Sequence, residues 1–142
     1  MNYVFSIIPH GMIYRFIPVL AHHFERSEYW SKGRSSVDDI VKFIYTGQMQ
    51  LWVIFDEEEK PIGYVVTEIK QYPQSKMLVW QYGAGDYGVL EATNDLVFET
   101  IERFAKDTGC NGLEVFGRPG WKREAKRYGL NSQTVMYEKF FD

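Results

Sequence analysis

The alternation of apolar and polar residues along the chain predicts a series of short strands and helices. Residues 3–8 are mostly β-branched or aromatic and stop at Pro9, which is typical of a short strand. Between residues 10 and 24 the apolar positions recur at helical spacing, and Pro18 predicts a kink there because proline lacks an N–H group. The polar stretch 25–34 is predicted to be a loop.

A second helix and a meander of strands are predicted in the middle of the chain. Ser36 and Asp39 have the spacing of a capping box, so a helix is expected to begin there and to end near Gly47. The three strands of the meander are predicted at residues 51–55, 62–72 and 77–80. The second of them departs from strict alternation, which predicts a β-bulge.

The last third of the chain predicts a long helix and two further strands. Residues 90–108 form the long helix, followed by Gly109 as its cap. Its apolar face, expected to pack across the sheet, consists of Leu90, Val97, Ile101 and Phe104. Then come a strand at 113–116, a short helix at 121–128 and a final strand at 134–141. Because a helix crosses between strands 77–80 and 113–116, we expect these two strands to be adjacent and parallel.

The composition excludes several classes of protein. The 142 residues suit one domain, and with 45% apolar and 25% charged residues the balance is that of a globular protein. No apolar run reaches the length of a membrane span, and no basic N-terminal segment predicts secretion. The single cysteine, Cys110, favours a reducing compartment and is expected to be a small buried residue. A net charge of -3 argues against nucleic acid as a partner.

Two segments carry a resemblance to a known superfamily. They are "GQMQLWVIFDEEEKPIGYVVTEIKQYP" at residues 47–73 and "GCNGLEVFGRPGWKREAKRYGL" at residues 109–130. With the order of predicted elements, they resemble the GNAT acetyltransferase superfamily, and more narrowly the small GNAT-like proteins of tailed bacteriophages and prophages. The resemblance implies one α/β (α+β) domain over residues 1–142, with a mixed, mainly antiparallel sheet flanked by helices.

The resemblance also implies a place for acetyl-CoA. In that fold the fourth and fifth strands splay, and the pyrophosphate of the cofactor lies at the N-terminus of the helix that follows. Free N–H groups and the helix dipole favour phosphate at such a position. Here the splayed strands would be residues 76–82 and 112–117, and the helix would begin near Leu90.

The stretch "QYGAGDYG" at residues 81–88 lies where the cofactor signature is expected. The candidate cofactor-binding residues in it are Gln81, Tyr82, Gly83, Ala84 and Gly85. It is one residue shorter than the family pattern, it contains no Lys or Arg, and Asp86 follows where phosphates would lie. The stretch is therefore either a phosphate cradle or the glycine-rich end of a strand, and acetyl-CoA is expected to bind weakly or not at all.

The basic stretch at residues 118–127 offers two further candidates for CoA phosphates, Arg118 and Lys122. The alternative is a solvated helix face, since runs of charge usually are. Trp121 lies within this stretch beside a turn that contains Pro119 and Gly120, and we expect its ring to be largely buried as an anchor.

Candidate catalytic residues come from the same resemblance. Many family members use a tyrosine near the last helix to protonate the CoA thiolate; Tyr128 and Tyr137 are the candidates here, and packing is the alternative for each. A general base would have to face the cleft, and Glu68 and Glu114 lie on predicted strands. No metal is expected, because the adjacent histidines His22 and His23 diverge by about 100° on a helix and no second cluster completes a shell.

Two functions follow from these observations. One is a virion- or assembly-associated phage protein, with reduced or no catalysis, that contacts phage structural proteins in the virion or the host cytoplasm. The alternative is an active acetyl-CoA-dependent N-acetyltransferase acting on a small amine or a protein amine. The sequence leaves the oligomeric state and the acyl acceptor open.

Overall fold

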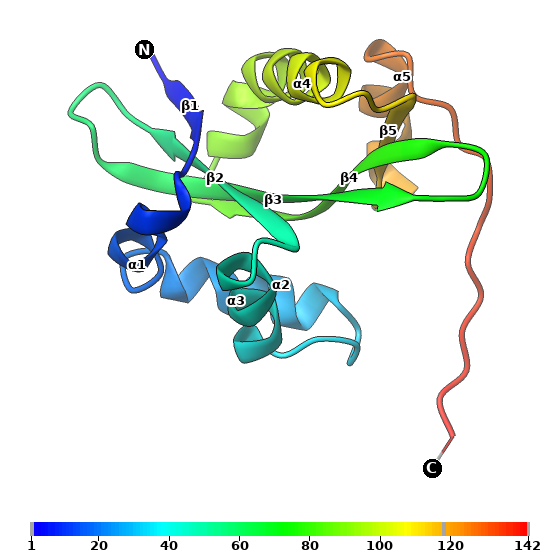
Figure 1. The fold of residues 1–142 in the computed structure, drawn as a ribbon, viewed down its shortest axis with the longest axis horizontal. Helices are drawn as coiled ribbons and strands as arrows, with labels where there is room; N and C mark the ends of the chain where they lie inside the picture. The colour runs from blue at the N-terminus through cyan, green and yellow to red at the C-terminus, as the bar shows by residue number, and fades with distance from the viewer. Residues whose placement is uncertain (1, 118, 142) are drawn as a thin grey trace.

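The fold is built on one mixed sheet with helices on both faces (Figure 1). The computed structural model describes residues 2–117 and 119–141. The sheet has five strands in the order β1-β2-β3-β4-β5: Val4–Ile7, Met49–Phe55, Pro61–Gln71, Lys76–Gly85 and Gly112–Val115. All neighbours are antiparallel except β4 and β5, which are parallel, as the crossing helix predicts.

The helices divide between the two faces of the sheet. One face carries η1 His10–Met12, α1 Ile13–Phe16, α2 Ala21–Trp30 and α3 Val37–Tyr45, and the other carries α4 Val89–Asp107, η2 Pro119–Trp121 and α5 Lys122–Arg127 (Figure 1). None of the helices in the described part of the chain is long and apolar enough to cross a membrane. The mixed α/β architecture predicted from the sequence is therefore confirmed.

The sheet has a hydrophobic core on each face, and side chains that point alternately to the two faces of each strand fill both. In β2, Val53 packs with the core under α2 and α3, whereas Trp52 and Ile54 pack with the core under α4. The long helix closes the second core through Val97 and Ile101, both buried, with Leu90 and Phe104 half-buried against it. The apolar face predicted for residues 90–108 is thus confirmed.

The N-terminal helices differ from the sequence prediction in one respect. The chain does break near Pro18, between α1 and α2, as predicted. The prediction of a loop over 25–34 is wrong for residues 25–30, because α2 continues to Trp30. The buried face of this segment carries Ser27, whose hydroxyl hydrogen-bonds the Tyr64 hydroxyl, so the helix packs through a small polar residue. The spacing of apolar residues gives no indication of a contact between two hydroxyl groups.

The capping box is present as predicted. The Ser36 hydroxyl accepts a hydrogen bond from the Asp39 N–H at 3.1 Å, and the Asp39 carboxylate accepts one from the Ser36 N–H at 3.0 Å. The Asp39 pKa is lowered, chiefly by the hydrogen bond from the Ser36 backbone.

The predicted final strand is not formed. Residues 131–141 have no regular secondary structure, and they run away from the sheet as an extended segment (Figure 1). Its exposed apolar side chains are Val135, Met136, Tyr137, Phe140 and Phe141. A strand pattern needs a neighbouring strand to pair with, and within the described residues this segment instead meets the α2–α3 loop.

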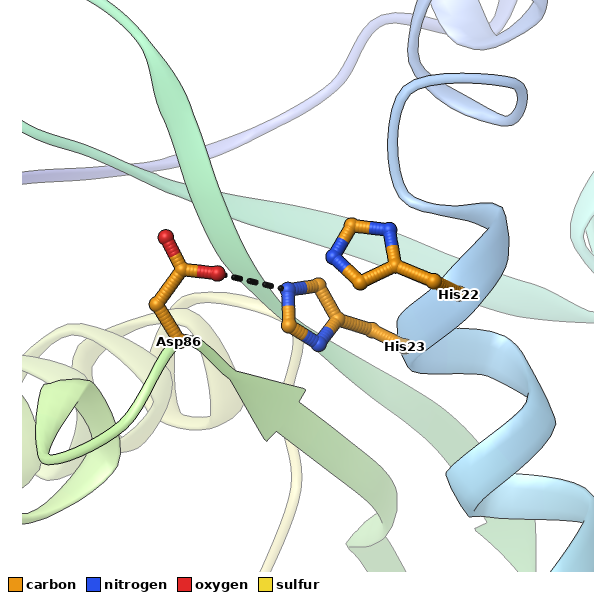
Figure 2. A group of neighbouring side chains, drawn as sticks. All are labelled: His22, His23 and Asp86. Atoms are coloured by element: carbon orange, nitrogen blue, oxygen red, sulfur yellow. Dashed lines mark hydrogen bonds and ion pairs between the residues drawn. The ribbon is translucent and has the colours of Figure 1, made fainter.

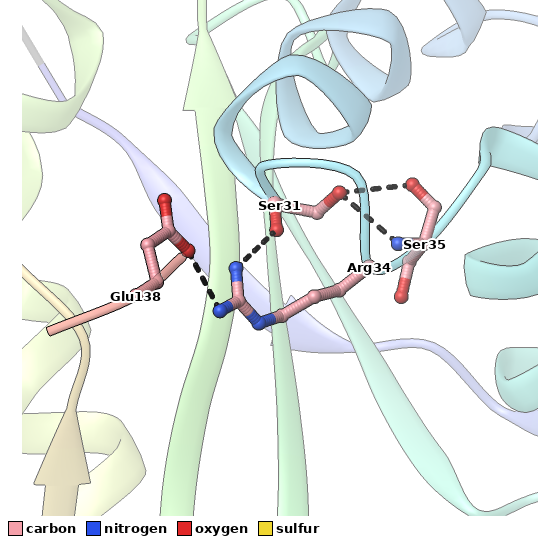
Figure 3. Close-up of polar contacts among 4 residues, drawn as sticks. All are labelled: Ser31, Arg34, Ser35 and Glu138. Atoms are coloured by element: carbon pink, nitrogen blue, oxygen red, sulfur yellow. Dashed lines mark hydrogen bonds and ion pairs between the residues drawn. The ribbon is translucent and has the colours of Figure 1, made fainter. Parts of the chain in front are cut away.

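That meeting point is an exposed ion pair. The Nη2 of Arg34 lies 2.7 Å from the Oε2 of Glu138. The Nη1 of Arg34 donates to the Ser31 carbonyl oxygen at 3.3 Å (Figure 3). Ser31 in turn holds Ser35 through hydrogen bonds of 3.0 and 3.1 Å (Figure 3). The Arg34 guanidinium also lies over the Phe140 ring, 5.6 Å from its centroid.

We expect Glu138→Gln to change the free energy of unfolding by less than about 1 kcal/mol, because exposed ion pairs contribute little. Chemical denaturation measures it. A loss well above that value would contradict an exposed, weakly attached segment at residues 131–141.

Candidate functional site

Strand β4 has a β-bulge next to the residue at which its pairing with β5 ends. Opposite β3, Val66 pairs with Tyr82 and Thr67 with Trp80, so Gln81 is an extra residue. Trp80 is also the last residue of β4 that pairs with β5. The pairing stops where β5 itself ends, at Val115, and β4 continues beside β3 alone to Gly85. The bulge predicted in the strand at 62–72 is not in that strand: β3 alternates regularly, with Val66 toward the core under α2 and α3 and Ile69 toward the core under α4, and the extra residue lies on β4.

The glycine-rich stretch belongs to the sheet. Gly83, Ala84 and Gly85 pair with Val65, Tyr64 and Gly63 of β3. The prediction that β4 ends near residue 80 is therefore wrong. In an extended strand, successive N–H groups point to opposite sides, so those of residues 83–85 do not converge on one anion. The next N–H group, that of Asp86, donates to the Ile62 carbonyl oxygen at 2.9 Å.

Close packing explains why glycines occupy this strand. A Cβ atom on Gly85 would lie 3.1 Å from the Ile62 carbonyl oxygen and 3.3 Å from the Gly63 Cα. A Cβ atom on Gly83 would lie 3.0 Å from the Trp80 Nε1, whose N–H donates to the Tyr82 carbonyl oxygen. The tight packing around both glycines comes from the fold itself and does not require a ligand.

Asp86 turns toward α2 (Figure 2). The His23 Nε2 donates to the Asp86 Oδ1 at 3.2 Å, and the Arg26 Nη1 donates to the Gly85 carbonyl oxygen at 2.9 Å. Burial lowers the pKa of His23, and the neighbouring His22 acts in the same direction, while Asp86 opposes them. The junction between β4 and α4 is thus tied to α2 by two contacts, and the carboxylate is half-exposed beside it.

A pocket of about 310 Å³ lies among α4, β5 and α5. Its lining residues are Asp95, Phe98, Glu99, Glu102, Leu113, Arg127 and Tyr128. Three of them are carboxylates and one is a guanidinium, which is already 2.6 Å from Glu124 and 3.8 Å from Asp95. This excess of negative charge disfavours phosphate groups in the pocket.

Tyr128 lies in that pocket with its proton directed at a carboxylate. Its hydroxyl donates to the Asp95 Oδ1 at 2.5 Å, and its ring stacks on Phe98 at 4.2 Å. Burial and this hydrogen bond raise the pKa of Tyr128 to about 12, so the phenol stays protonated at neutral pH. The other candidate phenol, Tyr137, lies in the exposed segment 131–141, outside the sheet.

The two candidate bases lie near each other on the sheet. Glu68 of β3 and Glu114 of β5 both pair with Val79 of β4, so one strand separates them. Glu68 is buried and accepts hydrogen bonds from Gln81 at 2.9 Å and from Gln48 at 3.2 Å. Gln81, a candidate for the cofactor, is therefore engaged with a carboxylate of the protein.

Glu114 is half-buried and accepts a hydrogen bond from the Tyr72 hydroxyl at 3.2 Å. That hydrogen bond raises the pKa of Tyr72. By strand alternation, Glu68 shares the face of Tyr64 and Val66, under α2 and α3, whereas Tyr128 lies on the α4 side. The structure thus brings Glu68 and Gln81 into contact, places Glu114 across β4 from Glu68, and leaves both candidate tyrosines apart from them.

The basic candidates are only partly described. Arg118 lies outside the described residues, and Lys122, the first residue of α5, is exposed. Trp121 was expected to be largely buried; it is half-buried, with its ring stacked on Phe98 at a centroid distance of 5.7 Å. Cys110 is likewise half-buried rather than buried.

Sequence reasoning missed a second hollow of about 480 Å³ on the α2 side. It is lined by Glu25, Glu28, Tyr29, Gly33, Ser35 and Ser36. Its carboxylates would suit a cationic group, although Glu28 already accepts a hydrogen bond from the Val37 N–H at 2.6 Å. Because residues 25–30 were interpreted as a loop, no pattern in the sequence indicated this hollow.

Comparison with known proteins identifies the fold. No protein-family model matches the sequence, and none of the curated proteins is significantly similar to it. A single-substitution mutant of the BH1408 protein from Bacillus halodurans superposes with a TM-score of 0.66 at 17% identity, over 97% of this chain and 99% of that one. An aminoglycoside acetyltransferase from an uncultured soil metagenomic sample gives a TM-score of 0.72 at 8% identity, over 100% of both chains.

A third similar structure is glucosamine-6-phosphate N-acetyltransferase from Arabidopsis thaliana. It gives a TM-score of 0.63 at 13% identity, over 100% of both chains. At such identities the likeness concerns the fold. The chain therefore has the fold of the GNAT acetyltransferases, with a mostly antiparallel sheet of five strands flanked by helices.

Proposed function

We propose that this chain uses the GNAT fold with weak or absent binding of acetyl-CoA and with reduced or no catalysis, as a phage-type protein of the virion or its assembly. The observation that carries the proposal is the geometry at the β4–α4 junction. Residues 83–85 are engaged in the sheet, and the next residue, Asp86, adds a half-exposed carboxylate that is hydrogen-bonded to His23 at the junction that leads into α4. A negative charge at that point repels phosphate, and the stretch 81–88 contains no Lys or Arg to offset it.

The N-terminus of α4 offers no compensating side chain. Its N-cap is Gly88, in a left-handed conformation with φ 79°, and no side chain caps the helix. Among the described residues, Arg26 reaches this junction, and its guanidinium donates to the Gly85 carbonyl oxygen. The residues at this junction therefore do not fit the phosphates of acetyl-CoA well.

A protein partner fits the remaining surface. The extended segment 131–141 exposes five apolar side chains within seven residues, at positions 135, 136, 137, 140 and 141. Exposed apolar side chains gathered in this way mark contact surfaces of proteins. In the proposed role this segment would bind a structural protein of the phage, in the virion or in the host cytoplasm.

An active acetyl-CoA-dependent N-acetyltransferase is the second candidate. It is favoured by the end of the pairing between β4 and β5 at Trp80 and by the buried carboxylate of Glu68 next to the bulge. A carboxylate so placed has the chemistry of a general base for an amine. The superposed structures named as acetyltransferases have the same fold, but fold alone is weak support for activity.

Titration with acetyl-CoA tests the proposal. We expect a dissociation constant for the wild-type chain no tighter than about 100 μM, or about -5.5 kcal/mol. Asp86→Asn should bind about fivefold more tightly, since unit charges about 4 Å apart in water interact by about 1 kcal/mol. Asparagine is chosen because its side-chain carbonyl oxygen can still accept the hydrogen bond from His23.

Asp107→Asn is the matched control, because it removes the same charge from the other end of α4, where the residue is exposed. It should leave the affinity unchanged. Micromolar affinity of the wild-type chain, or turnover with a polyamine or a peptide amine, would contradict the proposal and support the enzyme.

A further inference from the structure

Three potential metal ligands meet where α2 faces the β4–α4 junction (Figure 2). His22 and His23 belong to α2, and Asp86 is the residue that follows β4. One ligand atom of each of the three lies within 4.8 Å of the others. The two imidazole rings lie against each other with centroids 3.9 Å apart. Adjacent positions on a helix do diverge, yet the two side chains bring their rings to the same place.

The backbone fixes this arrangement from both sides. The Asp86 N–H donates to the Ile62 carbonyl oxygen at 2.9 Å, and its carbonyl oxygen accepts from the Val89 N–H at 3.0 Å. The Arg26 guanidinium joins α2 to the Gly85 carbonyl oxygen, one residue before Asp86. The carboxylate is thus presented to the histidines by a held backbone, although 63 residues separate it from His23.

We propose that His22, His23 and Asp86 bind a divalent transition-metal ion such as Zn²⁺. The separation of His23 Nε2 and Asp86 Oδ1 is 3.2 Å. Two tetrahedral ligands at about 2.0–2.1 Å from zinc lie about 3.3 Å apart, so an ion could take the place of the hydrogen bond between them. His22 is exposed and its side chain can turn to supply the third ligand.

The ligand set decides the class of ion. Two imidazoles and one carboxylate suit zinc and neighbouring transition metals, whereas Mg²⁺ and Ca²⁺ prefer oxygen ligands throughout. Three protein ligands would leave a fourth position for water, and Asp86 is half-exposed to solvent. Metal binding through Nε2 would require the tautomer of neutral His23 with its proton on Nδ1, so the proton now directed at Asp86 would move to that nitrogen.

The surroundings of His23 determine the expected affinity for Zn²⁺. The Nδ1 of His23 is buried and has no hydrogen-bond partner among the described residues. A ligating histidine normally donates its second N–H to an acceptor, and losing such a contact weakens metal binding by about 10–100-fold. We therefore expect micromolar rather than nanomolar affinity for Zn²⁺.

The test is calorimetric titration of Zn²⁺ alone into the full chain without an affinity tag. One ion should bind per chain with micromolar affinity, and the Tm should rise with the zinc concentration. Asp86→Asn and His22→Gln should each weaken binding at least about tenfold. His22 is exposed, so its replacement keeps the test valid even if a change at the buried His23 disturbs folding.

His10→Gln is the matched control, because the His10 Nε2 donates to the Tyr45 carbonyl oxygen at 2.6 Å, outside the cluster. It should bind zinc as the wild type does. Absence of saturable binding to the wild type, or equal affinity of the wild type and both cluster variants, would overturn the proposal. Acetyl-CoA titrations are to contain a chelator, so that the two results are independent.

Discussion

Phe98→Ala should lower the free energy of unfolding by about 3–5 kcal/mol, the range for large aromatic residues removed from a core. Phe98 is 5% exposed and lies on α4, where its ring meets rings from three other segments. Its ring centroid is 5.2 Å from that of Trp80, 5.7 Å from Trp121 and 4.2 Å from Tyr128. Removing it would leave a cavity between the sheet and α5.

Chemical denaturation of the variant measures this loss, and Trp121→Ala is the matched comparison. Trp121 is half-buried and its ring stacks on Phe98 at the edge of the same cluster. Its removal should cost about 1–2 kcal/mol, since only part of its area leaves water on folding. Equal losses for the two variants would show that the cluster is not centred on Phe98.

Periodicity predicted the elements that bury one face. The helix at 90–108 was predicted to within one residue at each end, because α4 carries a continuous apolar stripe and ends before Gly109, whose φ is 78°. The capping box at Ser36 also marked its helix correctly, since both hydrogen bonds are local. Features of this kind depend on residues close together in the chain, so the sequence displays them.

Elements that depend on distant partners were not predictable in the same way. Residues 25–30 continue the helix with contacts to distant residues: Ser27 meets Tyr64, 37 residues away, and Arg26 reaches Gly85, 59 residues away. Glycines at 83 and 85 favour a loop in the sequence, yet they permit close approach of strands. Residues 134–141 have the composition of a strand, but no described strand pairs with them.

In the candidate site, too, the features that depend on neighbouring residues were predictable and those that depend on distant residues were not. Glu68 could be proposed from its place on a strand, although its burial and its contact with Gln81 depend on the bulge. The charge of Asp86 was evident in the sequence and its unfavourable effect on phosphate could be argued directly. Its contact with His23 could not, because nothing in the local pattern relates α2 to the end of β4.

Gly85→Ala should lower the free energy of unfolding by about 1–3 kcal/mol, as overpacking does. The new Cβ atom would lie 3.1 Å from the Ile62 carbonyl oxygen and 3.3 Å from the Gly63 Cα, both in the backbone, and 3.3 Å from the Val89 Cβ. The neighbouring strand cannot give way there without disturbing its pairing with β4. Chemical denaturation measures the loss, and Gly11→Ala, where no atom lies within 4 Å, should change stability by less than about 0.5 kcal/mol.

Gly85→Ala also tests whether Gly85 is required for the packing of the strands or for the binding of a cofactor. Acetyl-CoA affinity of folded Gly85→Ala should equal that of the wild type, because the fold already uses the space around Gly85. In a phosphate cradle the outcome is reversed: the methyl group would block the ligand, so binding would be lost while stability changed little. Gly88→Ala serves as a second comparison, with open space around it and a left-handed φ of 79° that costs about 1–2 kcal/mol. Loss of binding in Gly85→Ala without loss of stability would assign this stretch to the cofactor and favour the enzyme.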